Sequence, residues 1–217
     1  MEPLLRLLQL ADSALPVGAA AHSFGLESLI EDGLLAAGEL ESYLGAYLEE
    51  SGRLDAAFCR AAHALATSRG EEFVLDWRNL NRRLSARKLS RESRDASLTL
   101  GRRFLVLASQ LLPDSIIPTA AETQAHHVAA FGLVAGVAGI DQRSAVLAWL
   151  HQSATTLISA AQRLAPVGQT NASRILWSLK PLMAEIAQGA AVENCFTPVP
   201  EIAAMRHAKL ATRLFIS

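Results

Sequence analysis

Two long segments without a charged residue constrain the fold of this chain most strongly. Residues 123–140 and 144–162 contain no Asp, Glu, Lys or Arg, and either is long enough to cross a bilayer as a helix. Each segment nevertheless carries polar side chains, among them Gln124, His126, His127, His151, Gln152 and Gln162. Because polar groups are costly in hydrocarbon, we expect two buried helices of a protein that does not span a membrane.

The rest of the sequence favours helices as well. Hydrophobic residues make up 51% of the 217 residues but aromatic residues only 6%, so alanine and leucine carry most of the apolar content. No sustained alternation of apolar and polar residues predicts a strand. We therefore expect an all-α protein, a compact single-domain helical bundle of about nine or ten helices over residues 1–217.

Glycine, proline and capping residues predict where the helices begin and end. Ser23 is expected to cap the second helix, Ser51 and Gly52 to form a joint between the third and fourth, and Pro181 to kink or shorten the helix at 171–188. The first predicted helix ends near residue 10, and the others cover residues 23–31, 39–50, 53–67, 71–84, 91–111, the two uncharged segments and 171–188.

The C-terminal tail, residues 198–217, is expected to be a separate element, since Pro198 and Pro200 interrupt any preceding helix. Helical periodicity over its last thirteen residues would place side chains on two neighbouring stripes, Arg206, Lys209 and Arg213 on one and His207, Leu210 and Leu214 on the other. The apolar residues at its end need a cover. Two interpretations stay open: the tail docks on its own core, or it docks on a partner protein.

Charge is distributed unevenly, although the net charge is only −1. Residues 1–55 hold ten acidic and two basic residues, a net charge of −8. Residues 78–103 hold nine basic residues against Glu92 and Asp95, a net charge of +7. Such a basic segment is typical of a solvated helix face. A helical regulator that binds nucleic acid remains the alternative, although no aromatic residues interleave to stack bases.

The cysteines and histidines predict neither disulfides nor a metal site. Cys59 and Cys195 stand alone, and no two histidines have the i and i+4 spacing of ligands on one helix face. His126 and His127 are adjacent, so we expect buried, hydrogen-bonded roles for them.

The acidic N-terminus, with Arg6 inside its apolar stretch, differs from a signal peptide, and we expect a cytoplasmic protein.

No motif predicts catalysis. Ser85 and Lys88 match the SxxK pattern of some hydrolases, but only two positions of that pattern are fixed and the surroundings are rich in arginine. His22, Ser23 and Glu27 could form a dyad with a carboxylate, yet Ser23 is more simply a helix cap. We expect no catalytic, cofactor-binding or metal-binding residues, and a protein that is not an enzyme.

Taken together, four segments resemble the UreF family of urease accessory proteins, and they occur in the order of that family. They are residues 7–18 running into 22–27, residues 90–97 with 101–103, residues 160–170, and residues 205–207 with 213–217. Their spread covers nearly the whole chain, which makes the combined match specific. The chain departs from the family at Ala19, Ala20 and Ala21, where members commonly have glycine or serine and then an aromatic residue.

The resemblance implies an all-α, usually dimeric scaffold that joins a UreH/UreD-type protein and the GTPase UreG during nickel insertion into urease. Arg213 matches the near-terminal arginine linked to UreG recruitment, and the C-terminal tail matches the segment that orders against UreH/UreD. Further expected partners are the urease apoprotein, through the complex, and a second copy of the chain, with no nucleic acid or membrane. The residues expected to bind partners are Pro16, Gly18, His22, Ser23, Gly25, Glu27, Arg206, His207, Lys209, Arg213, Leu214 and Phe215.

Overall fold

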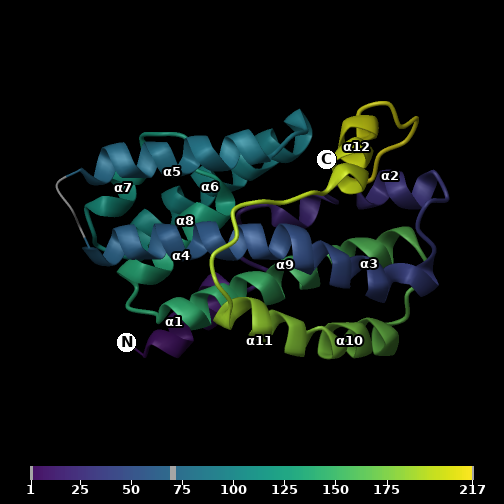
Figure 1. The fold of residues 1–217 in the computed structure, drawn as a ribbon, viewed down its shortest axis with the longest axis horizontal. Helices are drawn as coiled ribbons and strands as arrows, with labels where there is room; N and C mark the ends of the chain where they lie inside the picture. Colours follow the sequence, from purple (N-terminus) through teal and green to yellow (C-terminus); the bar gives the residue numbers. More distant parts are fainter. Residues whose placement is uncertain (1, 69–71, 217) are drawn as a thin grey trace.

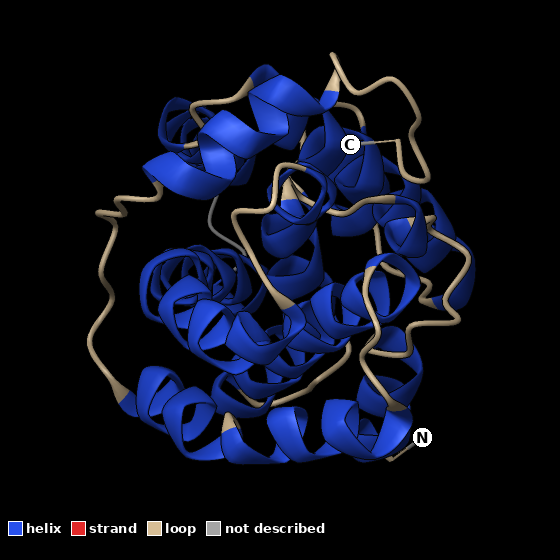
Figure 2. Cartoon of the chain, turned by 90° about the vertical axis from the view of Figure 1, so that its right-hand side faces the viewer, coloured by secondary structure: helices blue, strands red, loops and turns tan. Residues whose placement is uncertain are grey.

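A computed structural model describes residues 2–68 and 72–216, and the regular structure of these residues is entirely helical (Figures 1 and 2). The first elements are α1 (Pro3–Leu10), η1 (Ala19–Ala21), α2 (Leu26–Glu31), η2 (Ala37–Glu39), α3 (Leu40–Tyr47), η3 (Leu48–Gly52), α4 (Arg53–Ser68) and α5 (Phe73–Arg87). The later elements are α6 (Arg91–Leu111), α7 (Ile116–Ala121), α8 (His127–Val137), α9 (Gln142–Leu164), α10 (Gln169–Ser178), α11 (Lys180–Gln188) and α12 (Pro198–His207). The all-α prediction is confirmed.

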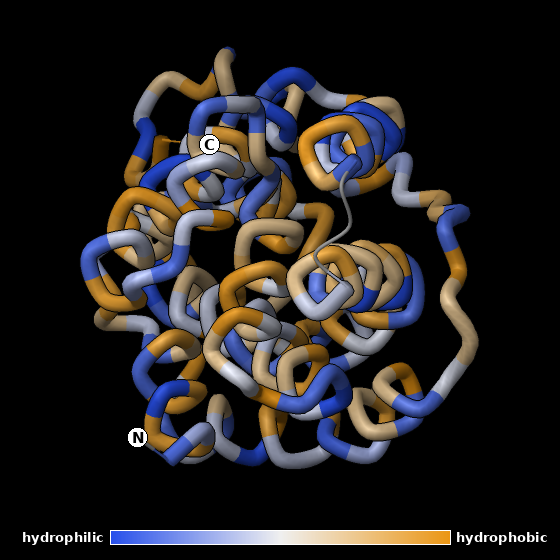
Figure 3. The backbone as a smooth tube through the Cα atoms, turned by 90° about the vertical axis from the view of Figure 1, so that its left-hand side faces the viewer, coloured by the Kyte–Doolittle hydropathy of each residue, from blue (hydrophilic) through white to orange (hydrophobic). Residues whose placement is uncertain are grey.

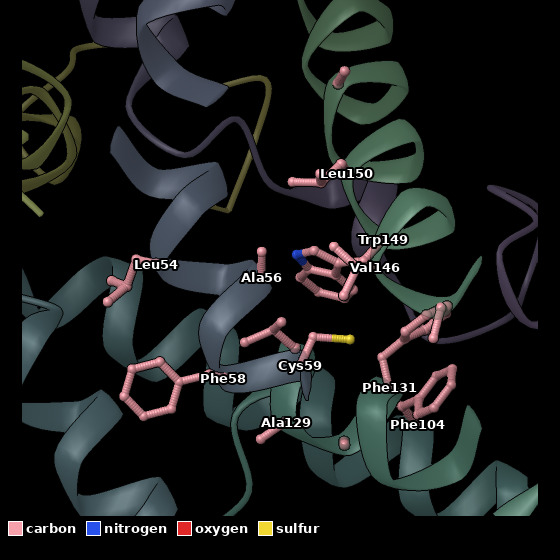
Figure 4. Close-up of a cluster of buried hydrophobic side chains, with 14 of the residues drawn as sticks. Leu54, Ala56, Phe58, Cys59, Phe104, Ala129, Phe131, Val146, Trp149 and Leu150 are labelled. Carbon is pink, nitrogen blue, oxygen red and sulfur yellow. The ribbon is translucent and has the colours of Figure 1, made fainter. Parts of the chain in front are cut away.

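Helix α8 forms the centre of the core. All of its residues from His127 to Ala135 are buried, and it packs against α4, α6 and α9. Figure 4 shows the side chain of Cys59 on α4 directed toward Phe131 of α8 and Trp149 of α9. Because nearly the whole circumference of α8 is covered by other helices, a charged side chain there would lose its water, which explains the absence of charge in residues 123–140.

The close approach of α4 and α8 depends on glycine. A Cβ atom on Gly132 would lie only 2.3 Å from the carbonyl oxygen of Cys59. One turn later, a Cβ atom on Gly136 would lie 2.8 Å from the Cβ atom of Ala66. Small residues at the facing positions therefore allow the backbones of α4 and α8 to come into contact. These residues determine the distance between the two helices.

Helices α3 and α4 are joined by the π-helical turn η3 and run nearly in line across the middle of Figure 1. The prediction that Ser51 and Gly52 form a joint between two helices is therefore wrong. The backbone stays in the helical region on both sides of the turn, at Leu48 and at Arg53. Gly52 is buried, and a Cβ atom there would lie 3.2 Å from Leu150, so packing against α9 favours this glycine.

The other predicted boundaries agree more closely with the structure. Helix α6 has the predicted bounds, and Pro181 stands at the start of α11, where it divides the predicted helix 171–188 into α10 and α11. Helix α2 begins at Leu26 with Gly25 as its N-cap, so the prediction that Ser23 caps it is wrong. Helix α7 was not predicted, and the expected helix start at residue 71 lies outside the described residues.

Neither uncharged segment forms a membrane span in the described part of the chain, where no helix is both long and apolar enough to cross a bilayer. The segments become α8 and most of α9. In Figure 3, hydrophobic and hydrophilic stretches alternate along many of the coils, as expected for helices with one buried face and one solvated face.

His126 connects α5, α6 and the start of α8. Its Nε2 atom lies 2.8 Å from Oγ of Ser85, and its Nδ1 atom lies 3.0 Å from Oγ of Ser97. The expected buried, hydrogen-bonded role is thus confirmed for His126. His127 is also buried, but its Nε2 atom lacks a hydrogen-bond partner. The hydroxyl of Ser85 bonds to His126, so the role of this serine here is to link helices.

These two histidines predict that the protein loses stability in mild acid. Burial lowers the pKa of His126 and of His127 to about 3, with smaller contributions from nearby positive groups. Both rings are therefore neutral in the folded protein at pH 5, whereas an unfolded chain with ordinary histidine pKa values binds protons there. The contribution of the two rings to the free energy of unfolding is complete above about pH 6.5. It is lost progressively as the pH falls toward 3, at up to about 1.4 kcal/mol per pH unit for each ring.

Urea denaturation at pH 7 and pH 5 checks this expectation, with His127→Leu as the matched variant. Removing one titrating ring should lessen the dependence of the unfolding free energy on pH. If wild type and variant lost the same free energy between the two pH values, His127 would not be a buried neutral ring in the folded protein.

Candidate partner-binding site

The C-terminal tail folds back onto α2 and is held there by the carboxylate of Glu27, which is only 2% exposed. Nε2 of His207 lies 2.6 Å from Oε2 of Glu27. The backbone N–H of Leu214 donates to Oε1 at 2.6 Å, and that of Phe215 donates to Oε2 at 3.3 Å. One buried carboxylate therefore fixes the end of α12 and the last turn of the chain at the same time.

Arg163 of α9 covers the end of the tail. Its guanidinium lies 4.3 Å from the centre of the Phe215 ring, and that ring is buried. Nη1 of the same guanidinium donates to the carbonyl of Ala20 at 3.0 Å. Next to it, the backbone N–H of Ile216 donates to the carbonyl of Ala21 at 2.8 Å. The tail and η1 are thus linked twice, by the Arg163 guanidinium, which contacts both segments, and by a backbone hydrogen bond between them.

The segment before α2 is bent by residues in left-handed conformations. Gly18 has φ of 89°, and a Cβ atom there would lie 2.8 Å from Nη1 of Arg103. Phe24 has φ of 53°, which is uncommon for a residue with a side chain. Gly25, with φ of 88°, allows the start of α12 to approach, since a Cβ atom would lie 2.7 Å from the carbonyl oxygen of Pro200.

The structure brings the two predicted groups of site residues together. We call their combined surface the tail–turn surface, made of residues 16–27 and the described part of the tail, 198–216 (Figure 1). Within it, Pro16 is exposed and His22, Ser23 and Gly25 are buried. Burial lowers the pKa of His22, and the positive charges of Arg103 and His207 lower it further.

The predicted helical stripes of the tail are wrong, because α12 ends at His207. The amides that would continue a helix are used elsewhere, with those of Leu214 and Phe215 bonded to Glu27. Arg206 lies at the end of α12 and forms an ion pair of 3.0 Å with Asp32. Lys209 and Arg213 lie beyond the helix and are exposed.

Both interpretations of the tail have support in this geometry. Phe215 is covered by the protein itself, as expected for a tail docked on its own core. Apolar side chains on the outer face of α12 and beside it remain exposed: Phe196, Val199, Ile202, Met205, Leu214 and Ile216. The inner side of the tail therefore belongs to the core, and its outer side presents an apolar surface to solvent.

Three residues that contact the tail–turn surface were not among the predicted site residues: Arg163, Arg103 and Asp32. Arg163 had a usable signal, since it is the first charged residue after the uncharged segment 144–162. A cation at that place must lie where the buried helix reaches the surface. Arg103 lies in the segment 101–103 that resembles the family, but neither it nor Asp32 gave a signal of its contact, because these contacts join parts of the chain far apart in the sequence.

The basic segment 78–103 is largely occupied by contacts within the protein. Arg83 and Arg87 pair with Glu193 at 3.2 and 3.5 Å, and Arg91 pairs with Asp95 at 3.2 Å. Arg94 and Arg103 donate to backbone carbonyls, those of Lys88 and Val17. These contacts favour a structural role for much of the segment.

Among the described residues, no group of three or more His, Cys, Asp and Glu side chains is placed to hold a metal ion. A dyad of His22 and Ser23 with Glu27 was one interpretation of the sequence. In the structure the carboxylate of Glu27 bonds instead to His207 and to two tail amides. The fold and the tail–turn surface define an all-α protein whose distinctive feature is a C-terminal tail ordered against the segment before α2.

Comparison with known proteins agrees with this class and makes it specific. Residues 35–180 match the family model described as UreF. The chain is 35% identical to the urease accessory protein UreF of Nostoc sp. (strain PCC 7120 / SAG 25.82 / UTEX 2576), over 98% of this chain and 95% of the relative. It is 32% identical to that of Lachnoclostridium phytofermentans, over 98% of each chain, and 30% identical to that of Bacillus sp. (strain TB-90), over 100% of each.

The chain belongs to the UreF family. It is accordingly a urease accessory protein and not itself a catalyst, and it acts together with other urease accessory proteins. The resemblance found in the sequence is confirmed over nearly the full length of the chain.

Proposed function

We propose that this protein is a cytoplasmic scaffold that bridges a UreH/UreD-type protein and the GTPase UreG, and that it modulates UreG during nickel insertion into urease. It reaches the urease apoprotein through that complex and forms a homodimer within it. Membership of the UreF family supports the accessory role. The finer assignment of partners is what the resemblance to that family implies, and the geometry of the tail–turn surface supports it.

One observation carries the proposal: a single carboxylate, Glu27, ties the tail to the segment before α2. In this arrangement the backbone at Arg213, an exposed residue, is held next to Leu214, whose amide is fixed by Glu27. An arginine presented by an ordered backbone suits recognition of a carboxylate or phosphate, since binding then has to order the side chain and not the backbone. We assign UreG to Arg213 and the 16–27 segment.

The outer face of α12 is assigned to the UreH/UreD-type protein. Val199, Ile202 and Met205 recur at helical spacing along one side of α12 and are 57%, 54% and 44% exposed. Phe196, 79% exposed, precedes the helix. Apolar and aromatic side chains of this kind are typical of the energetically important centre of an interface.

Size exclusion with light scattering tests the proposal, using the protein with its cognate UreH/UreD-type protein, UreG, GTP and nickel. We expect a complex that contains all three proteins. Arg213→Ala should keep the UreH/UreD-type partner and weaken UreG binding by about 30-fold or more, as for an arginine hot spot. Arg78→Ala, which removes an exposed arginine from α5, is the matched control and should assemble as wild type.

Deleting residues 206–217 is expected to abolish the ternary complex and leave the helical circular dichroism signal nearly unchanged. Only Arg206 and His207 of that segment belong to α12. Loss of the helical signal on deletion would assign the tail to the fold itself. Failure of the wild-type protein to bind either partner would overturn the bridging role.

A further inference from the structure

Two buried polar atoms on neighbouring helices lack a hydrogen-bond partner, and their residues line the same cavity. They are Nε2 of His127 on α8 and Oε1 of Gln152 on α9. The two residues are only 6% and 5% exposed. The cavity that both residues line has a volume of about 70 Å³. Neither atom has a role in the tail–turn surface.

A third polar group in the cavity wall is the buried carboxylate of Asp55 on α4. Nε1 of Trp149 donates to its Oδ2 atom at 3.0 Å, and the Trp149 ring meets the His127 ring edge to face at 4.9 Å between centres. Asp55, His127 and Gln152 therefore line one cavity together with this indole ring, and three different helices supply them.

An empty cavity at this place would be costly. Each buried donor or acceptor without a partner destabilises the folded state by about 1–3 kcal/mol. A cavity of about 10–15 Å³ suffices for one water molecule when polar partners are present, so this one has room for several. Water can both donate and accept, which suits Oε1 of Gln152 as well as either tautomer of His127.

We infer that this cavity is a binding site for a small cluster of ordered water molecules bonded to Gln152, His127 and Asp55. The water molecules bridge polar side chains of α4, α8 and α9 that do not bond to one another directly, and they supply the missing partners of Gln152 and His127. This inference rests on the cavity alone and does not depend on the partners proposed above.

The water site also adjoins the segment before α2. Ala19 and Phe24 line the same cavity, and Phe24 is the residue with the left-handed backbone. A second cavity, of about 50 Å³, shares Phe24 and Asp55 with the first and reaches Glu201 of α12. Bound water in the first cavity would therefore support the bend at Phe24 from inside the molecule.

A crystal structure at a resolution that shows ordered water tests the inference directly, together with data from xenon-pressurised crystals. We expect solvent density within hydrogen-bonding distance of Oε1 of Gln152 and of Nε2 of His127, and no xenon in the cavity, since xenon fills dry apolar cavities. Xenon occupancy, an empty cavity or an anomalous signal from a metal ion would each overturn it.

Solution NMR gives a second, independent measurement on the intact protein. The indole N–H of Trp149 should show a cross-peak to long-lived water, whereas that of Trp77, bonded to the carbonyl of Ala120 at 3.2 Å, should not. Gln152→Met keeps the side-chain length, removes one polar wall group and should weaken the Trp149 cross-peak. Absence of that cross-peak in the wild type would contradict the water site whether or not the variant folds.

Discussion

Gly132→Ala is expected to destabilise the protein by at least about 3 kcal/mol, at the upper end of the range for overpacked cores. The added methyl group would stand 2.3 Å from the carbonyl oxygen of Cys59, and this obstacle is backbone. No change of rotamer can relieve the contact, so α4 and α8 must separate along the centre of the core. Urea denaturation followed by circular dichroism measures the effect.

Gly45→Ala is the matched control. Gly45 also lies inside a helix, α3, but a Cβ atom added there would meet no neighbouring atom within 4 Å. Alanine should stabilise α3 there by about 0.5–1 kcal/mol, because it restricts the unfolded chain and favours helix. A Gly132→Ala protein as stable as wild type would mean that α4 and α8 are not in backbone contact.

Glu27→Ala is expected to release the C-terminal tail. The substitution removes the acceptor for the amides of Leu214 and Phe215 and for His207, and each donor left unpaired costs about 1–3 kcal/mol when it stays buried. The tail can avoid most of that cost by peeling away into water. We therefore expect local opening, with a smaller change in global stability.

Hydrogen exchange of the Leu214 and Phe215 amides distinguishes these outcomes. In Glu27→Ala both amides should exchange much faster than in wild type, while the amides of α8 stay protected. Glu31→Ala, one turn further along α2 and exposed, is the control and should leave tail exchange unchanged. Continued protection of both amides in Glu27→Ala would show that Phe215 and Arg163 hold the tail without the carboxylate.

The helical core was predictable from the sequence because its cause is local. A long, mainly apolar run without charge, such as 123–140, favours burial away from water. The neighbouring segments have no strand periodicity, so the elements that cover this run must be helices. Pro181 marked a helix boundary for an equally local reason, since proline has no backbone N–H. The π turn at η3 was not predictable, because Ser51 and Gly52 carry the composition of a joint, and the packing of Gly52 against Leu150 of α9 is a contact between distant parts of the sequence.

The tail–turn surface was predictable in its residues but not in its geometry. Family resemblance pointed to Glu27, His207 and Phe215 as separate parts of two segments. Their convergence depends on contacts across about 180 positions of chain, as between Glu27 and His207, and no periodicity encodes such a separation. For the same reason the tail was expected to stay helical, although its amides bond to a distant carboxylate.

The π turn at η3 also affects how this chain can tolerate changes in length. A π turn holds one residue more than an α-helical turn, so it stores a residue that the helix can lose. Removing one residue from Leu48–Gly52 could return the turn to ordinary α-helix, with α3 and α4 each keeping the faces they bury. The same deletion in the middle of α4 would rotate every later side chain by about 100° and turn the small residues that face Gly132 and Gly136 away from α8. Loss of a single residue is therefore expected to be tolerated at 48–52 and not in the middle of α4.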